Sequence, residues 1–324
     1  MFSIGWEEIQ DAAARIAGVV HETPLAPAPA LSAAAGGEVW LKLEHRLWPV
    51  GSFKLRGAYN RMARLTAAER ARGVLTVSAG NHAQAVAYCA QMLELDAVIY
   101  MPTTTPSVKV ENTRRFGADV RLEGGDYDAS AARAHAFEQA SGRVFVHAFC
   151  DPAIIAGAGT AALEILRQQP DIDTLVVPVG GGGLAIGCGV AAKSQRGGVR
   201  VVGVQPEASA PFHHALRAGR RVDVPIGASL ADALVGELIS EEFFQLFREW
   251  VDDVVTVGEP ALERGIYWML EHHGEVIEGA GAAGIAAILE GRIELRGRKT
   301  AVLVTGRGID FDALLEIIQR HAGA

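Results

Sequence analysis

A lysine with a distinctive neighbourhood, Lys54, lies in the run Gly51-Ser52-Phe53-Lys54-Leu55-Arg56-Gly57-Ala58, among small and apolar residues and directly after an aromatic one. An ammonium group in such surroundings is poorly solvated, so its pKa is expected to fall. The free amine is then available to attack a carbonyl or to accept a proton. The sequence therefore indicates a catalytic lysine. An ordinary lysine, with a packed stem and a solvated head, is the alternative that the local sequence leaves open.

A polar turn, Ser78-Ala79-Gly80-Asn81-His82, follows the apolar run 74–77 and precedes residues 83–91, which have helical composition. This order predicts a strand, a tight turn and the start of a helix. Exposed backbone N–H groups at a helix start form an anion site, which suits a carboxylate or a phosphate. Ser and Asn are also common in turns and caps for purely structural reasons.

A second turn, Gly180-Gly181-Gly182-Gly183-Leu184, lies between the strand-like residues 174–179 and a helix of small residues at 185–192. Four glycines allow the backbone to fold closely around a tetrahedral oxyanion, with successive N–H groups pointing inward. The run matches neither GxGxxG followed by an acidic residue nor GxxxxGK[ST]. Dinucleotide-binding and P-loop sites are therefore disfavoured.

Together these three motifs resemble the fold-type II pyridoxal-phosphate (PLP) enzymes, in particular serine/threonine dehydratases and serine racemase. Further matches occur in the family's order within residues 101–110, 155–160 and 305–306, and the resemblance extends from about residue 16 to about residue 312. It implies an α/β fold like that of the tryptophan synthase β subunit, with two domains whose mostly parallel sheets are covered by helices. The stretch before the lysine is similar to the hydroxyectoine-utilisation dehydratase branch, near phenylserine dehydratases.

The resemblance assigns the cofactor PLP and the residues that hold it. Lys54 would form the covalent link to PLP and act as general base, and Phe53 would lie near the cofactor ring. Asn81 would reach the phenolic oxygen of the cofactor, residues 180–184 would bind its phosphate, and the Thr305 hydroxyl would face the pyridine nitrogen. A hydroxyl at that place leaves the nitrogen largely unprotonated, which suits elimination better than transamination.

The resemblance also assigns substrate contacts. Those expected to hold the amino acid are Ser78, Ala79, Gly80, Asn81, His82 and Phe149, with the turn clamping the carboxylate and His82 in a structural or orienting role. Serine racemase has a serine, the acid/base of the opposite face, where this chain has Ala79. A methyl group delivers no proton, so racemisation is expected to be weak or absent.

The implied reaction is dehydration of a 3-hydroxy-L-amino acid to a 2-oxo acid and ammonia, which is ammonia-lyase chemistry. Several substitutions relative to the family, including Cys150, Ala233 and Arg307-Gly308, suggest a remodelled side-chain pocket, so L-threonine need not be the best substrate. Trp48 and Phe149 would favour an aromatic substituent, as in phenylserine, and this apolar pocket is the preferred hypothesis. Alternatively, Arg307 or Arg46 would pair with a distal carboxylate, as in 3-hydroxyaspartate. A racemase and a β-replacement enzyme are the rival activities.

The elements that must position these residues alternate between strand and helix. Such alternation predicts parallel sheets covered by helices, with ligands at the carboxyl ends of strands. The predicted strands are 39–43, 74–77, 97–101, 118–122, 144–147, 174–179, 200–204 and 300–304. The predicted helices include 108–116, 129–140, 154–167 and 260–272.

The expected domains are a large PLP-binding domain, 1–70 with 150–324, and a small α/β domain, 71–149. No C-terminal regulatory domain is expected. The racemase-like members hold a divalent cation after the strand that corresponds to 201–204. Here Gln205, Ser209 and Pro211 supply no pair of carboxylates, so no metal is expected.

Bulk composition narrows the class further. The 324 residues carry a net charge of −8, which argues against nucleic acid or an anionic membrane as partner. The three cysteines are scattered without CxxC spacing, and no segment has the pattern of a signal peptide or membrane span. We therefore expect a cytoplasmic enzyme whose partner is a small amino acid, and the resemblance further suggests a homodimer.

Overall fold

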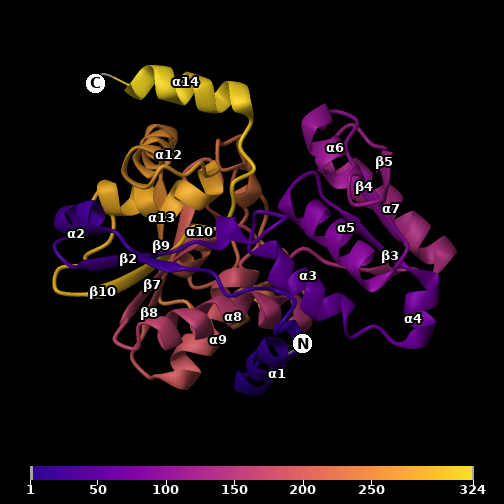
Figure 1. The fold of residues 1–324 in the computed structure, drawn as a ribbon, viewed down its shortest axis with the longest axis horizontal. Helices are drawn as coiled ribbons and strands as arrows, with labels where there is room; N and C mark the ends of the chain where they lie inside the picture. Colours follow the sequence, from indigo (N-terminus) through magenta and orange to yellow (C-terminus); the bar gives the residue numbers. More distant parts are fainter. Residues whose placement is uncertain (1–2, 323–324) are drawn as a thin grey trace.

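The computed structural model describes residues 3–322 as an α/β protein with two sheets (Figure 1). The larger sheet has six strands in the order β1-β2-β10-β7-β8-β9, and only β1 runs antiparallel to its neighbour. Its strands are β1 (Leu25–Pro27), β2 (Glu38–Lys42), β7 (Thr174–Pro178), β8 (Arg200–Pro206), β9 (Asp253–Val257) and β10 (Lys299–Leu303). The predicted α/β class with mostly parallel sheets is confirmed.

The smaller sheet has four parallel strands in the order β5-β4-β3-β6. These strands are β3 (Val74–Val77), β4 (Ala97–Met101), β5 (Asp119–Leu122) and β6 (Val144–Phe145). All four lie within the span 71–149 that the sequence assigns to a small domain, although the boundaries of that domain remain a prediction.

Helices cover both sheets. They are α1 (Trp6–Ile16), α2 (Pro29–Ala35), α3 (Lys54–Met62), α4 (Ala67–Arg72), α5 (Asn81–Leu93), α6 (Ser107–Arg114), α7 (Tyr127–Ser141), α8 (Pro152–Gln168), α9 (Gly183–Gln195), α10 (Pro211–Ala218), α11 (Glu241–Trp250), α12 (Glu259–His273), α13 (Gly279–Leu289) and α14 (Phe311–His321), with short 3-10 turns at η1 (Glu44–Arg46) and η2 (Asp232–Leu234). Helices α1, α8 and α9 pack on one face of the larger sheet, whereas α2, α12 and α13 pack on the other (Figure 1).

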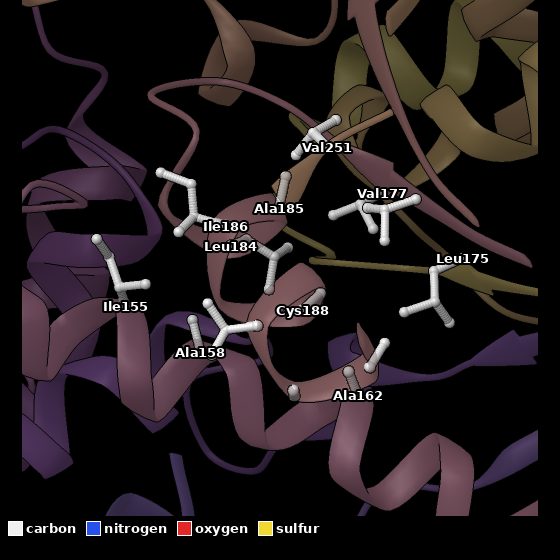
Figure 2. Close-up of a cluster of buried hydrophobic side chains, with 14 of the residues drawn as sticks. Ile155, Ala158, Ala162, Leu175, Val177, Leu184, Ala185, Ile186, Cys188 and Val251 are labelled. Atoms are coloured by element: carbon white, nitrogen blue, oxygen red, sulfur yellow. The ribbon is translucent and has the colours of Figure 1, made fainter. Parts of the chain in front are cut away.

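The core beside the glycine turn is built from small side chains on α8 and α9 and from branched side chains on β7 (Figure 2). The two helices approach closely because Gly159 and Gly187 face each other. A Cβ on Gly187 would lie 2.3 Å from the Ile155 carbonyl oxygen, and one on Gly159 would lie 2.5 Å from the Gly187 carbonyl oxygen. This contact fixes the position of α9, and thus of the turn that opens it.

The sequence analysis did not predict two of the strands, and both lie at the edges of the larger sheet. Strand β1 has three residues and ends in Pro27, which lacks the N–H that a central strand would need. Strand β9 begins at Asp253, so its start resembles a polar loop, and its burial is mixed. The other eight predicted strands are present, with bounds within two residues.

The candidate motifs all follow the carboxyl ends of strands, one in the smaller sheet and two in the larger sheet. The polar turn follows β3, the glycine turn follows β7, and Thr305 follows β10. In such sheets ligands bind beyond the carboxyl ends of strands. Among residues 3–322, no helix is both long and apolar enough to cross a membrane.

Candidate active site

A cavity lies where loops from both sheets meet, and it encloses about 560 Å³ of space between atoms, part of it open to solvent. Its lining consists of Phe53, Lys54, Asn81, Ala148, Phe149, Ile154, Ala158, Pro178, Gly180, Gly181, Gly182, Gly183, Leu184, Ala233, Leu234, Glu278, Ala280 and Thr305. Every residue that the sequence assigns to cofactor binding is in this set. Of the predicted substrate contacts, Asn81 and Phe149 are in it.

Lys54 is the first residue of α3, and its side chain enters the cavity. The Nζ atom donates a hydrogen bond to the Ala148 carbonyl oxygen at 2.8 Å and lies 5.2 Å from the centre of the Phe53 ring. Burial lowers the pKa of Lys54 to about 8, and the negative charge of Glu278 opposes part of that shift. A substantial fraction of the amine is therefore unprotonated at neutral to mildly alkaline pH.

Helix α3 is held in place by a buried ionic cluster two residues beyond Lys54. Arg56 is fully buried, and its five N–H groups all donate hydrogen bonds: two reach Glu44, two reach Glu164 and one reaches Thr160. Lys42 is also fully buried and forms an ion pair with Glu164 at 2.6 Å. Two cations and two carboxylates balance, so this cluster joins β2, α3 and α8 without a net buried charge.

The glycine turn needs glycine both for its backbone conformation and because its neighbours pack closely against it. Gly182 has φ of 89°, a left-handed conformation that disfavours other residues. A Cβ on Gly181 would lie 2.4 Å from the Phe149 ring, and one on Gly183 would lie 2.7 Å from the Phe149 carbonyl oxygen. Because α9 begins at Gly183, the free N–H groups of its first turn and its positive dipole end face the cavity, which fits a phosphate group.

Phe149 packs against this turn. Its ring also meets His147 edge-on at 4.7 Å and Phe243 at 6.1 Å. The sequence assigns Phe149 to the substrate pocket. Its observed neighbours place it at the end of the cavity formed by the glycine turn, and it contributes to the lining there.

The polar turn places Asn81 at the start of α5, where its amide lines the cavity. The Ser78 hydroxyl accepts a hydrogen bond from the Gly80 N–H at 3.2 Å, which tightens the turn. Ser78, Ala79 and Gly80 lie beside the cavity and are outside its lining as described for residues 3–322. Of this turn, Asn81 is the residue that shares the cavity lining with Lys54.

His82 is buried and takes no part in the cavity lining. Its Nε2 atom is 3.0 Å from the Val146 carbonyl oxygen. Burial, reinforced by the charge of Lys54, lowers the pKa of His82 to about 3, so the imidazole is neutral and Nε2 is the donor. This geometry supports the structural role expected for the imidazole.

Thr305 follows β10, is almost fully buried and lines the cavity. Its carbonyl oxygen accepts a hydrogen bond from the Phe53 N–H at 3.1 Å, which joins the last loop to the residue before Lys54. The Ser52–Gly306 bridge strengthens the same junction. The backbone at Thr305 is therefore held beside the residues that precede Lys54.

Glu278 is a site residue that the sequence analysis missed. It precedes α13, is 5% exposed and lines the cavity. Its carboxylate accepts hydrogen bonds from Asn81 Nδ2 at 2.7 Å and from the Gly308 N–H at 2.8 Å. Burial and the nearby Asp232 raise the pKa of Glu278 to about 7. The only signal in the sequence is an acidic residue directly before a helix of small residues.

The position that corresponds to the cation site of racemase-like members is occupied by a neutral network. Gln205 Oε1 accepts hydrogen bonds from the N–H groups of Phe212 at 3.0 Å and His213 at 3.1 Å, at the start of α10. The Ser209 hydroxyl is 3.1 Å from the Gly236 N–H. The described part of the chain holds no group of three or more His, Cys, Asp or Glu side chains suited to a metal ion.

These features fit pyridoxal phosphate. The N–H groups of the glycine turn suit its phosphate, the Lys54 amine suits its aldehyde carbon, and the Asn81 amide and Thr305 hydroxyl suit its ring heteroatoms. The cavity between these groups is lined by apolar residues such as Ala148 and Leu234, which suit an aromatic ring.

Comparison with known proteins gives independent support. Residues 16–306 match the family model described as "Pyridoxal-phosphate dependent enzyme". The chain is 43% identical over 314 residues to an L-threonine ammonia-lyase of Thermotoga maritima, covering 97% of this chain and 78% of that protein. It is 35% identical over 313 residues to the catabolic L-threonine dehydratase of Escherichia coli K12, covering 96% and 95% respectively.

Solved structures agree with these matches. Maize serine racemase superposes with a TM-score of 0.93 at 30% identity, covering 99% of this chain and 98% of that one. The processed form of tomato threonine deaminase isoform 2 superposes with a TM-score of 0.90 at 33% identity, covering 100% and 96%. Both superpositions extend over nearly the whole of each chain. By its sequence, its fold and the chemistry of its cavity, this chain belongs to the pyridoxal-phosphate-dependent enzymes of fold type II.

Proposed function

We propose that this protein is an ammonia-lyase that dehydrates a small 3-hydroxy-L-amino acid, of the L-threonine or L-serine type, to a 2-oxo acid and ammonia. The observation that carries the proposal is the Lys54 amine, whose pKa is lowered to about 8, in one cavity with the glycine turn and Asn81. The threonine ammonia-lyases and dehydratases among its relatives support the same reaction.

Each residue has a distinct task in this proposal. Pyridoxal phosphate, when bound, supplies the electron sink that makes the Cα proton acidic. Lys54 Nζ accepts that proton, and burial keeps its pKa in the range where it can do so near neutral pH. Asn81 and the N–H groups of the polar turn hold the substrate carboxylate. The C–O bond to the β-hydroxyl breaks, and the hydroxyl takes up a proton, so that the hydrogen of Cα and the hydroxyl are lost together as water. A second water molecule then hydrolyses the C–N bond of the released product, which gives ammonia and the 2-oxo acid.

Racemisation is the second candidate, because maize serine racemase superposes closely. Exchange of the Cα proton between two faces needs an acid/base group on the face opposite Lys54. The polar turn offers Ala79 where serine racemase has a serine, and a methyl group neither donates nor accepts a proton. We therefore propose elimination as the main activity, and chiral analysis of recovered L-serine tests this directly.

The preference for a small substrate rests on where the larger side chains lie. Trp48 is 70% exposed, and its ring lies 5.6 Å from the Arg307 guanidinium carbon, outside the cavity lining. Arg46 is already paired with Glu275. Trp48, Arg46 and Arg307 are thus outside the cavity lining, and of the two aromatic residues proposed for a phenylserine pocket Phe149 alone lines the cavity. Arg307 would have to move on substrate binding to pair with the distal carboxylate of 3-hydroxyaspartate.

A substrate panel distinguishes these versions. Release of 2-oxo acid should be measured for L-threonine, L-serine, threo-phenylserine and threo-3-hydroxyaspartate with the wild type and with Arg307→Ala. The proposal predicts the highest kcat/KM for L-threonine or L-serine, with little change in Arg307→Ala. A preference for phenylserine would support the apolar pocket, and a preference for hydroxyaspartate that disappears in Arg307→Ala would support the acidic one.

A further inference from the structure

Glu278 joins three segments that are far apart in the chain. Its carboxylate binds the Asn81 amide at the start of α5, in the unit of the smaller sheet, and the Gly308 N–H in the last loop, in the unit of the larger sheet. Figure 1 shows α5 and α13 in these two units. A second contact crosses between the same units nearby, from Lys109 on α6 to Asp232 at 2.7 Å.

The space around the carboxylate is tightly filled. A Cβ on Gly306 would lie 2.2 Å from Glu278 Oε1, and a Cβ on Gly308 would lie 2.9 Å from Oε2 and 3.2 Å from Asn81 Oδ1. The Glu278 N–H also donates to the Gly306 carbonyl oxygen at 3.2 Å. The last loop therefore passes close to the carboxylate, which has little freedom to move.

From this geometry we propose that Glu278 is a positioning residue: its ionised carboxylate holds Asn81 and the Gly308 loop together and so fixes the Asn81 amide in the orientation that the cofactor needs. One N–H of the Asn81 amide is committed to Glu278, so the other N–H is the one that remains for the cofactor. The inference rests on the dependence of this family on pyridoxal phosphate, and it is independent of which amino acid is the substrate.

The charge of Glu278 matters because both of its partners are donors. An ionised carboxylate accepts both hydrogen bonds, whereas a protonated one carries an O–H that must point away from one of them. The charged groups that act on Glu278 are Asp232, which raises its pKa, and Lys109, which lowers it; Lys54 on α3 interacts with it as well. With a pKa of about 7, the carboxylate loses its charge as the pH falls below neutrality, and its hold on Asn81 weakens in the same range.

Glu278→Gln tests the inference with little change in shape. The glutamine amide has one oxygen and one NH2 group, so one of the two donors, Asn81 or Gly308, meets another donor. Loss of a hydrogen bond to a charged group predicts about tenfold or greater weakening of cofactor affinity above pH 7. The affinity should be measured by titrating the cofactor-free protein with pyridoxal phosphate between pH 6 and 9, without any amino acid.

A matched control lies at the other end of the same helix. Glu290 follows α13 and pairs with Arg264 and Arg292 on the surface, so Glu290→Gln should leave the affinity unchanged. Gly308→Ala is a second test, because its Cβ would push into Glu278 and Asn81 while the backbone there tolerates alanine. We expect it to weaken cofactor binding in the same direction as Glu278→Gln.

The pH dependence of cofactor affinity shows whether Glu278 positions Asn81 or only stabilises the fold. In the wild type the affinity should fall as the pH is lowered through about 7, and in Glu278→Gln this component should be missing. Wild-type affinity with a wild-type pH profile in Glu278→Gln would overturn the inference. So would a lower melting temperature of the cofactor-free variant without any change in affinity. If the protein binds cofactor as described but turns over no hydroxy amino acid, the proposed function fails and this inference stands.

Discussion

Replacing Arg56 with methionine probes the ionic cluster that supports the lysine helix. The change removes all five hydrogen bonds of the guanidinium and leaves Glu44, which is fully buried, and Glu164 opposed by Lys42 alone. The cluster then has two carboxylates and one cation, a net buried charge of −1. Removing one partner of a buried ion pair costs about 3–5 kcal/mol, and methionine fills most of the volume, so a cavity adds little.

A surface pair provides the comparison. Arg264 donates to Glu290 at 2.7 Å but is 45% exposed, and exposed pairs contribute about 1 kcal/mol or less. Arg264→Met should therefore lower the free energy of unfolding in urea far less than Arg56→Met. The double variant Arg56→Met/Glu44→Gln removes the uncompensated charge and should recover part of the loss.

The assay is urea unfolding of the cofactor-free protein, followed by circular dichroism, with cofactor affinity measured in parallel. Because α3 begins at Lys54, loss of the cluster should also weaken cofactor binding in Arg56→Met. If Arg56→Met is no more destabilising than Arg264→Met, the buried cluster contributes no more to stability than the exposed pair does. The costs of Arg56→Met and Glu44→Gln should also not be additive. If the double variant loses the sum of the two single-variant free energies, the two charges do not interact and the expected ion pair is contradicted.

Three further predictions concern the cavity and its surroundings. Gly181→Ala should weaken cofactor affinity strongly, because the new Cβ would lie 2.4 Å from the Phe149 ring; unchanged affinity in a titration would contradict the phosphate-binding assignment. The association rate of pyridoxal phosphate with cofactor-free protein, followed by absorbance, should rise with pH through about 8 and then level off, because the unprotonated Lys54 amine is the reacting form; a rise that continues to pH 10 would show an unshifted lysine. Prolonged chelation should leave activity intact, since Gln205 caps α10 through hydrogen bonds; a loss restored by magnesium or calcium would show a cation site that this account lacks.

The motifs that could be predicted from the sequence are those whose function is local. The glycine turn follows β7 of the larger sheet and the polar turn follows β3 of the smaller sheet, so each lies at the carboxyl end of a parallel strand, where ligands bind. Lys54 and Thr305 could be added because their motifs resemble those of a known family. In the structure, Lys54, Asn81, the glycine turn and Thr305 do line one cavity.

What could not be predicted depends on contacts between distant segments. Glu278 meets Asn81 across 197 positions of sequence, and Arg56 meets Glu164 across 108. An isolated Glu or Arg in the sequence carries no sign of such a partner. The direction of a side chain is equally hidden: Trp48 precedes the lysine motif by only a few residues, yet its ring faces solvent and Arg307.

Whether Lys54 performs the elimination is tested by the release of 2-oxo acid and ammonia from L-threonine by the cofactor-loaded protein and by Lys54→Ala. The account predicts equal amounts of the two products from the wild type. It predicts no detectable release from Lys54→Ala, even with excess pyridoxal phosphate and an intact circular dichroism spectrum. Turnover that persists in folded Lys54→Ala would contradict the account, as would a cofactor-loaded wild type that releases neither product from L-threonine or L-serine.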